Sequence, residues 1–371
     1  RRKHPANMGL GKLLESAGYD FKRKITSGFI GFGLAPRLNA GGRMGDAKRG
    51  VRLFTTRDEE EAAAIAAEME VENSHRKETE QMILKQVTDR IEASDAIRNS
   101  RVMVVAGEGW HHGVIGIVSS RIKDMYYRPN ILLSVEDGVA KGSARSIEGF
   151  NLFDALCTCS DLMIKFGGHA AAAGMSLKAE NVPELARRLN EYAKIHMDSQ
   201  MLVPVQRPEL RLKPSEVTVE LIELIQRMEP FGQDMPEPLA EISGQLSEVR
   251  KIGADGATLR MKIMDHRRSL GTVGFRRSIM AEYYSAGMEV SIAGNLDINY
   301  YMDRQYPQMI LKDVRIAQDD NLEKLQHISG GGSCINIHEI IWFYKPCRIL
   351  SYRLLCIQIN IFFLRHSRLF S

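Results

Sequence analysis

Cysteine is scarce in this chain of 371 residues, and the spacing of the few cysteines excludes two common kinds of site. No pair has the CxxC spacing of a structural zinc site, and the pattern is not the disulfide framework of a small secreted domain. The five residues are Cys157, Cys159, Cys334, Cys347 and Cys356. We therefore expect a protein of the reducing cytoplasm.

Long apolar runs are missing as well. No stretch reaches the roughly 18 apolar residues that a membrane-spanning helix needs, so no membrane association is expected. The chain begins RRKHPANMG, without an initiator methionine and without the basic and then apolar pattern of a signal peptide. We interpret this start as a truncation.

A strong net charge is also absent. The formal net charge is +4 at pH 7, but residues 333–371 hold five lysines and arginines and one acid, which accounts for all of it. The preceding 332 residues therefore sum to zero. Any contact with nucleic acid has to come from local clusters of cations rather than from the overall charge.

The sequence pattern divides the chain into five segments. Residues 57–95 start with a helix cap and a run of acids and predict a long, exposed connecting helix. Residues 96–200 alternate strands with helices, which indicates an α/β domain. Residues 201–320 turn to short alternating runs separated by turns, typical of a small antiparallel β-barrel. Residues 1–56 precede the helix, and residues 321–371 form an atypical tail that we expect to be unstructured or out of frame.

The densest cluster of unusual residues is PRLNAGGR at positions 36–43. Glycines at this density permit close approach of the backbone or positive φ angles. Arg37 and Arg43, with Asn39 between them, suit a forked anionic partner such as a phosphate. A buried strand and turn would explain the same glycines, so these residues alone leave both interpretations open.

A second cluster, GWHHGVIG at positions 109–116, is predicted at a turn from a strand into a helix. The free N–H groups at a helix start attract anions, which makes His112 a candidate contact. A histidine that merely packs on a domain face is the alternative. Trp110 precedes the histidine pair and no aspartate flanks it, so we predict no metal role there. Arg121 follows on the same helix as a further cation.

The segment KGSARS at positions 141–146 places cations and hydroxyls around one glycine at a predicted strand end. Ser143 and Arg145 can converge on one phosphate through charge-assisted hydrogen bonds. A solvated edge strand would give the same composition.

The segment FGGH at positions 166–169 is followed by four alanines and a glycine. We predict a glycine-rich turn in which Gly167 and Gly168 let the backbone press against a substrate. His169 is then either a site residue or a structural histidine.

Exposed aromatic rings beside arginines would let the predicted barrel stack single-stranded bases, although barrel aromatics are as often part of the core. The candidates are Phe275, Tyr283, Tyr284, Tyr300 and Tyr301.

Taken in order, APRLNAGGRM, GWHHGVIGIVSSR, KGSARS and FGGHAAAAG resemble the motifs of RecJ-like single-stranded-DNA-specific exonucleases of the DHH phosphoesterase superfamily. EPFGQDMPEP at 229–238 is similar to the start of their oligonucleotide-binding (OB) barrel, although Gln233, Asp234 and Met235 stand where that pattern has x-Gly-Asn. The resemblance covers roughly residues 20–320. It implies the remnant of a DHH domain at 1–56, a DHHA1 substrate-binding domain at 96–200 and an OB-fold at 201–320.

The resemblance also implies roles for single residues. Ser143 and Arg145 match the pocket for the DNA 5′-phosphate, and His169 matches the histidine that faces the metal-containing cleft and the scissile phosphate. The remaining matched positions are expected to bind the 5′-phosphate or the strand: Arg37, Asn39, Arg43, His112, Arg121, Gly167 and Gly168.

Members of the family hold Mn²⁺ or Mg²⁺ with DxDG and DHH motifs that precede APRLNA. This chain has neither motif and no aspartate-rich cluster, so we expect no metal ligands in it and no activity of the chain alone. The intact parent is then expected to be a 5′→3′ single-stranded-DNA exonuclease of recombination and repair. Its expected partners are single-stranded DNA and a helicase or a single-strand-binding protein, and the expected state is a monomer.

Two alternatives stay open. One is a phosphodiesterase of the same superfamily for short oligoribonucleotides or cyclic dinucleotides, enzymes that usually lack the barrel. The other is a non-catalytic nucleic-acid-binding module, against which APRLNAGGRM and the long connecting helix argue.

Overall fold

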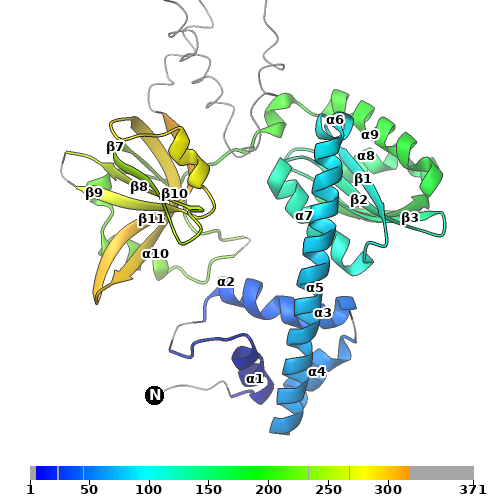
Figure 1. The fold of residues 1–371 in the computed structure, drawn as a ribbon, viewed down its shortest axis with the longest axis horizontal. Coiled ribbons are helices and arrows are strands. Elements are labelled where there is room, and N and C mark those ends of the chain that lie inside the picture. The colour runs from blue at the N-terminus through cyan, green and yellow to red at the C-terminus, as the bar shows by residue number, and fades with distance from the viewer. Residues whose placement is uncertain (1–5, 23–24, 45, 233, 267, 317–371) are drawn as a thin grey trace, which may run out of the picture. The chain divides into compact units, whose positions relative to one another are not determined.

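The computed structural model describes residues 6–22, 25–44, 46–232, 234–266 and 268–316 (Figure 1). The chain divides into two compact units, residues 1–204 and residues 205–371. The tail predicted at 321–371 lies outside the described residues. Among the residues that are described, no helix is both long enough and apolar enough to cross a bilayer.

The N-terminal part of the first unit is helical. Its elements are α1 (Met8–Ser16), α2 (Ser27–Phe29), a π-helical turn (Ile30–Leu34), α3 (Ala35–Met44) and α4 (Lys48–Thr55). The strand and turn considered for residues 28–56 are therefore not formed. Leu34 and Leu53 pack in one buried core with Leu13, Leu14 and Met69, and this burial outweighs the local preference of the glycines.

The predicted connecting helix is α5 (Glu59–Ala93). Asp58 caps it by accepting hydrogen bonds from the backbone N–H groups of Glu60 and Glu61, and the acids of the first turn favour the positive end of the helix dipole. The N-terminal half of α5 packs on the first helices and its C-terminal half packs on the α/β domain, as Figure 1 shows for the first unit.

The α/β domain has a five-stranded sheet in the order β1-β2-β3-β5-β4. Strands β1 and β2 are parallel and the other neighbours are antiparallel. The strands are β1 (Met103–Glu108), β2 (Asn130–Glu136), β3 (Val139–Arg145), β4 (Met163–His169) and β5 (Ala172–Lys178). The helices are α6 (Asp95–Arg98), α7 (His112–Tyr126), α8 (Leu152–Cys157) and α9 (Val182–His196), with 3₁₀ turns at Ser160–Leu162, Ala179–Asn181 and Ser199–Leu202.

Helices cover the two faces of this sheet differently. Met103, Val105 and Leu132 pack on α5 and α7, whereas the alternate residues of the same strands pack on α8 and α9. The glycine-rich turn predicted at 166–168 was wrong, because these residues extend β4 up to His169. Pairing with β5 supplies backbone hydrogen bonds that the local sequence does not reveal.

The second unit is the predicted barrel. It contains β6 (Leu210–Leu212), a 3₁₀ turn (Pro214–Glu216), α10 (Val219–Gln226), β7 (Ala240–Ile252), β8 (Thr258–Met264), β9 (Ser269–Gly274), a 3₁₀ turn (Ser278–Glu282), β10 (Glu289–Tyr301) and β11 (Arg304–Ile316). Strands β7, β8, β9, β11 and β10 follow each other, and the pairing of β10 with β7 closes the ring. Closure removes the free sheet edges, and the alternate residues that point inward form the core.

Candidate nucleic-acid-binding site

Strand register brings four of the predicted site residues onto one sheet face. Ser143 lies opposite Gly174 on β5, which in turn lies opposite Gly167 on β4. In the next row, Arg145 lies opposite Ala172, which lies opposite His169. Because alternate residues of a strand share a face, both rows face the same side of the sheet. We call this surface the open face; its members are Ser143, Arg145, Gly167, His169, Ala172 and Gly174.

Helix α7 borders the open face. It packs on β2 and β3, whereas Gly167, His169 and Gly174 beyond it are exposed. A Cβ atom on Gly116 of α7 would lie 3.1 Å from Ser143 Oγ and 3.3 Å from Arg145 Nη2. The helix can approach the two side chains this closely because position 116 is glycine.

The Arg145 guanidinium is held by neighbouring hydroxyl and carbonyl groups. Its Nε donates to Ser120 Oγ (3.1 Å), and its Nη1 donates to Ser143 Oγ (3.0 Å) and to the Ala144 carbonyl (2.8 Å). Burial lowers the pKa of Arg145, and the positive charge of Arg43 lowers it further. Two cations therefore stand near each other, and neither forms an ion pair within the described part of the chain. Such a pair is stabilised by an anion.

Arg43 reaches this site from the end of α3. Its Nη1 donates to the carbonyl oxygen of Gly113 (2.8 Å), in the first turn of α7. A Cβ atom on Gly113 would lie 2.8 Å from the backbone oxygen of Arg43, so the two helix ends touch. The start of α7 thus lies beside Arg43, with the positive end of its dipole there.

The two histidines before and within α7 differ in role. His111 is the N-cap, and its Nδ1 accepts a hydrogen bond from the Gly113 backbone N–H (3.1 Å). His112 is exposed at the first helical position, where a ligand at the helix start can reach it. On the far side of the open face, His169 Nδ1 accepts from the Ala171 backbone N–H at 3.3 Å.

Comparison with known proteins identifies the same two domains as the fold. Two family models match, the DHHA1 domain over residues 99–195 and the RecJ OB domain over residues 209–313. The single-stranded-DNA-specific exonuclease RecJ of Bacillus subtilis is 39% identical over 322 residues, covering 86% of this chain and 40% of that protein. The exonuclease RecJ of Escherichia coli is 33% identical over 314 residues, covering 82% of this chain and 54% of that protein.

A solved structure supports the assignment. RecJ from Thermus thermophilus, crystallised in complex with Mn²⁺, matches with a TM-score of 0.69 at 28% identity over 84% of this chain and 44% of that one. The chain belongs to the RecJ family. It spans about half the length of the curated relatives it matches. The DHHA1 domain and the OB barrel expected from the motifs are confirmed for this RecJ-family chain.

Arg37 and Arg121 of this RecJ-family chain have partners other than the open face. Arg37 donates through Nε to Glu70 and through Nη1 to the Gly33 carbonyl (2.6 Å), both within the helical part. Arg121 forms an ion pair with the buried Glu80 of α5 (Nε to Oε1, 2.5 Å). Asn39 is exposed on α3. The structure therefore gathers Arg43, Ser143 and Arg145 and pairs Arg37 and Arg121 with carboxylates of α5 instead. Asn39 lies one helical turn before Arg43, on the same side of α3.

Sequence reasoning passed over two positions that shape the cluster. Ser120 holds Arg145, and Gly116 makes room for it. Their spacing of four residues, which places both on one side of a helix, was the available signal. The sequence does not reveal that β3 lies beside α7, so this spacing alone could not identify Arg145 as the side chain that Gly116 and Ser120 contact.

Metal ligands do not cluster in the part of the chain that the structure describes. No group of three or more histidine, cysteine, aspartate or glutamate side chains is placed to hold an ion there. The residues present therefore do not fit the two-metal centre that the family resemblance implied.

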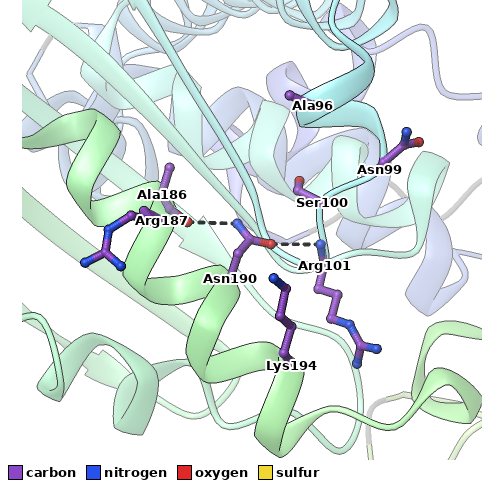
Figure 2. A pocket seen from close by; sticks show the side chains of 8 residues that line it. All are labelled: Ala96, Asn99, Ser100, Arg101, Ala186, Arg187, Asn190 and Lys194. Atoms are coloured by element: carbon purple, nitrogen blue, oxygen red, sulfur yellow. Dashed lines mark hydrogen bonds between the residues drawn. The ribbon is translucent and has the colours of Figure 1, made fainter.

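A cavity in the described part of this RecJ-family chain lies away from the open face. It has a volume of about 430 Å³ and lies between α9 and the segment leading into β1 (Figure 2). Figure 2 shows Asn190 between Ala186 and Arg101; its side chain donates to the Ala186 carbonyl (2.9 Å) and accepts from the Arg101 backbone N–H (2.9 Å). The bond to Arg101 fastens α9 to the segment before β1, so Asn190 has a structural role.

Proposed function

We propose that this chain is the substrate-binding part of a 5′→3′ single-stranded-DNA exonuclease and that it binds the 5′-phosphate between Arg43 and Arg145. The observation that carries the proposal is the pair of guanidinium groups without an acidic partner in the described part of the chain. The relatives named single-stranded-DNA-specific exonuclease support the choice of substrate.

Each group at this site has a task in the proposal. Arg145 is oriented by Ser120 and Ser143, so that Nη2 remains for a phosphate oxygen. Arg43 supplies a second cation, and His112 and the start of α7 supply donors and the helix dipole. Charge-assisted bonds from several donors favour a terminal phosphate over a hydroxyl.

The rest of the open face guides the strand toward the scissile bond. Neighbouring strands are about 4.8 Å apart, so His169 lies about 10 Å from Arg145 between backbones. One phosphate does not bridge that separation, and the two residues therefore contact different groups of the strand. Gly167 is exposed on this face and has no side chain, so it leaves room for the DNA backbone, whereas Gly168 lies opposite Ala173 and faces the other side of the sheet.

Cleavage itself is assigned to no residue cluster of this chain. RecJ from Thermus thermophilus was crystallised with Mn²⁺ and with Mg²⁺. We place such ions, in the intact protein, on parts of the relatives that this chain does not cover. The purified chain should therefore release no nucleotides from single-stranded DNA in Mn²⁺. Metal-dependent release that EDTA stops would contradict this assignment.

The barrel, in this proposal, holds the strand beyond the 5′ end through stacking on exposed aromatics. A helicase or a single-strand-binding protein would supply the strand during recombination and repair, with a monomeric protein acting in the cytoplasm. The barrel argues against the phosphodiesterases of short substrates, which usually lack it.

The deciding experiment is a competition between 5′-phosphorylated and 5′-hydroxyl single strands of one sequence for the full chain. We expect the phosphorylated strand to bind about tenfold or more tightly, since a charge-assisted contact contributes roughly 1.5–3 kcal/mol. Equal affinity for both strands would favour a general nucleic-acid-binding module. A matched RNA pair tests the choice of sugar.

A further inference from the structure

The buried stripe of α5 changes its chemistry midway. Its first part is apolar and belongs to the core of the helical part: Ala62, Ile65, Ala66 and Met69. Its last part is apolar and belongs to the core of the α/β domain: Ile83, Val87 and Ile91. Between them, the same stripe carries Asn73, Arg76 and Glu80, which are only 0%, 7% and 2% exposed. Two turns of helix therefore bury charge where hydrocarbon would be expected.

One carboxylate serves two cations in this segment. Arg76 Nη1 donates to Glu80 Oε2, and Arg76 Nη2 donates to Asn73 Oδ1 at 3.2 Å. Glu80 Oε1 lies 2.5 Å from Arg121 Nε, which belongs to α7. The Asn73 amide nitrogen, Arg76 Nε and Glu80 Oε1 are buried without a hydrogen-bond partner in the described chain, so Glu80 Oε1 meets Arg121 as an ion pair only. Buried ion pairs contribute little to net stability, but removing one partner is costly, so they specify a geometry.

This segment lies where two helices that border the candidate site rest on α5. Helix α3, which carries Arg43, is held on α5 by the pair of Arg37 with Glu70. Helix α7, which carries the glycine and serine positions around Arg145, packs on α5 through an apolar core, to which Arg121 and Glu80 add an ion pair. The place of Arg43 relative to Arg145 is thus set partly through α5 and partly by the direct contact of Arg43 with Gly113.

We propose that Glu80 is a positioning residue for the phosphate site: by binding Arg121 it holds α7 against α5 and so sets the separation of Arg43 and Arg145. Arg121 is then a brace and not a phosphate ligand. This inference rests on the proposed function, because it assigns the binding of the 5′-phosphate to Arg43 and Arg145.

A double-mutant cycle in the full chain tests the proposal. Glu80→Gln, Arg121→Gln and the double variant are compared by their affinity ratio for 5′-phosphorylated over 5′-hydroxyl single strands. Each single variant should lower the ratio about three- to tenfold, and the double variant should lower it no further, because both changes break one linkage. Arg121→Lys keeps the charge and should restore part of the ratio.

Two results would overturn the inference. If the losses from Glu80→Gln and Arg121→Gln multiply in the double variant, Arg121 acts on the strand by itself. If neither variant changes the ratio, the linkage does not position the site.

Hydrogen exchange without DNA gives an independent readout, which also decides the matter if Glu80→Gln fails to fold. Arg121 is half exposed, so Arg121→Gln should fold. If Arg121 holds α7 on α5, the Arg121→Gln variant should exchange its α7 amides faster in the free protein. A phosphate ligand would leave that exchange unchanged, which would refute the inference.

Failure of this inference and failure of the proposed function are distinguishable. If Arg145→Gln abolishes the preference for the 5′-phosphate and Glu80→Gln does not affect it, only the positioning role is lost. If the wild-type chain has no preference, the proposed function falls first. Arg187→Gln on α9 serves as the control, since it removes an exposed arginine paired with Glu184 on the opposite face of the sheet.

Discussion

Arg43 at the end of helix α3 and Arg145 at the end of strand β3 are close enough that the charge of Arg43 adds to burial in lowering the pKa of Arg145. The ordinary pKa of arginine is so high that Arg145 stays charged at neutral pH despite this lowering. The mutual repulsion of Arg43 and Arg145 raises the free energy of the folded protein, and an anion between them would remove this penalty. A terminal phosphate carries the negative charge that would offset this repulsion.

Replacing either arginine of the pair should weaken binding of a 5′-phosphorylated strand. For Arg145→Gln we expect about a tenfold to hundredfold loss, because the charge-assisted bond of Nη2 and the positive charge behind it disappear together. Arg43→Gln should also make the salt dependence of binding shallower, as one phosphate contact fewer releases fewer counterions. Fluorescence anisotropy at several salt concentrations measures both effects. An Arg145→Gln chain that keeps the affinity and the phosphate preference of the wild type would exclude the site.

Two glycines near the site should respond in opposite ways to alanine. In Gly113→Ala, the new Cβ would stand 2.8 Å from the Arg43 backbone oxygen, so the helix ends have to separate, at a cost of about 1–3 kcal/mol. In Gly167→Ala, nothing lies within 4 Å of the new Cβ, so stability should stay within about 0.5 kcal/mol. The methyl group would instead stand on the open face and weaken DNA binding. Urea unfolding and strand affinity, measured on both variants, separate the two effects; equal unfolding midpoints would contradict the contact of α3 with α7.

The barrel should lose stability in acid through Glu241. Burial by itself would raise the pKa of this carboxyl, but the Ser291 hydroxyl (2.7 Å) and the charges of Arg315 and Arg211 lower it below 4.5 overall. A carboxylate with a lowered pKa stabilises the fold above its ordinary pKa, and this contribution disappears as the pH falls through the lower value. Glu241→Gln should therefore cost more stability at pH 7 than at pH 3.

Calorimetric unfolding across that pH range tests the prediction for Glu241. Glu223→Gln, at an exposed position of α10, is the control. A difference between wild type and Glu241→Gln that stays constant from pH 7 to pH 3 would refute the assigned linkage.

Tyrosines of the barrel should divide into a binding and a structural group. Tyr300 and Tyr301 are 69% and 59% exposed at the end of β10, whereas Tyr284 is 3% exposed and donates its hydroxyl to the Val314 carbonyl (3.1 Å). Tyr301→Ala should weaken binding of long single strands by about 1 kcal/mol or more and leave the preference for a 5′-phosphate unchanged. Tyr284→Phe should lower stability by about 1 kcal/mol with no change in binding. Strand affinity and urea unfolding, measured on both variants, check these predictions. Unaltered affinity of Tyr301→Ala would show that the end of β10 is not part of the binding surface.

The sequence predicted the architecture well because its signals are local. The Asp58 cap and the acids after it predicted α5. The change from an apolar strand pattern to a helix pattern around Trp110 predicted β1 and α7. The alternation of apolar and polar residues in short runs indicated the barrel. The motif order pointed to the RecJ family, which the comparisons confirmed.

Local signals were misleading where tertiary contacts decide the conformation. The glycines of 166–168 suggested a turn, but pairing with β5 makes them a strand. The glycines of 28–56 left a strand and turn open, but burial of Leu34, Ala40 and Leu53 makes the segment helical.

What the sequence determined by itself is therefore the order of the domains, the type of the elements outside residues 28–56 and 166–168, and the identity of the cations. Which cation meets which partner was decided by the tertiary structure alone. Arg37 and Arg121 have the same chemistry as Arg43 and Arg145, yet the first two pair with carboxylates of α5, whereas the last two lie close enough for their charges to interact. The physical reason is that charge interactions depend on distance in space, and that distance follows from the strand order and from the packing of α3 and α7 on α5.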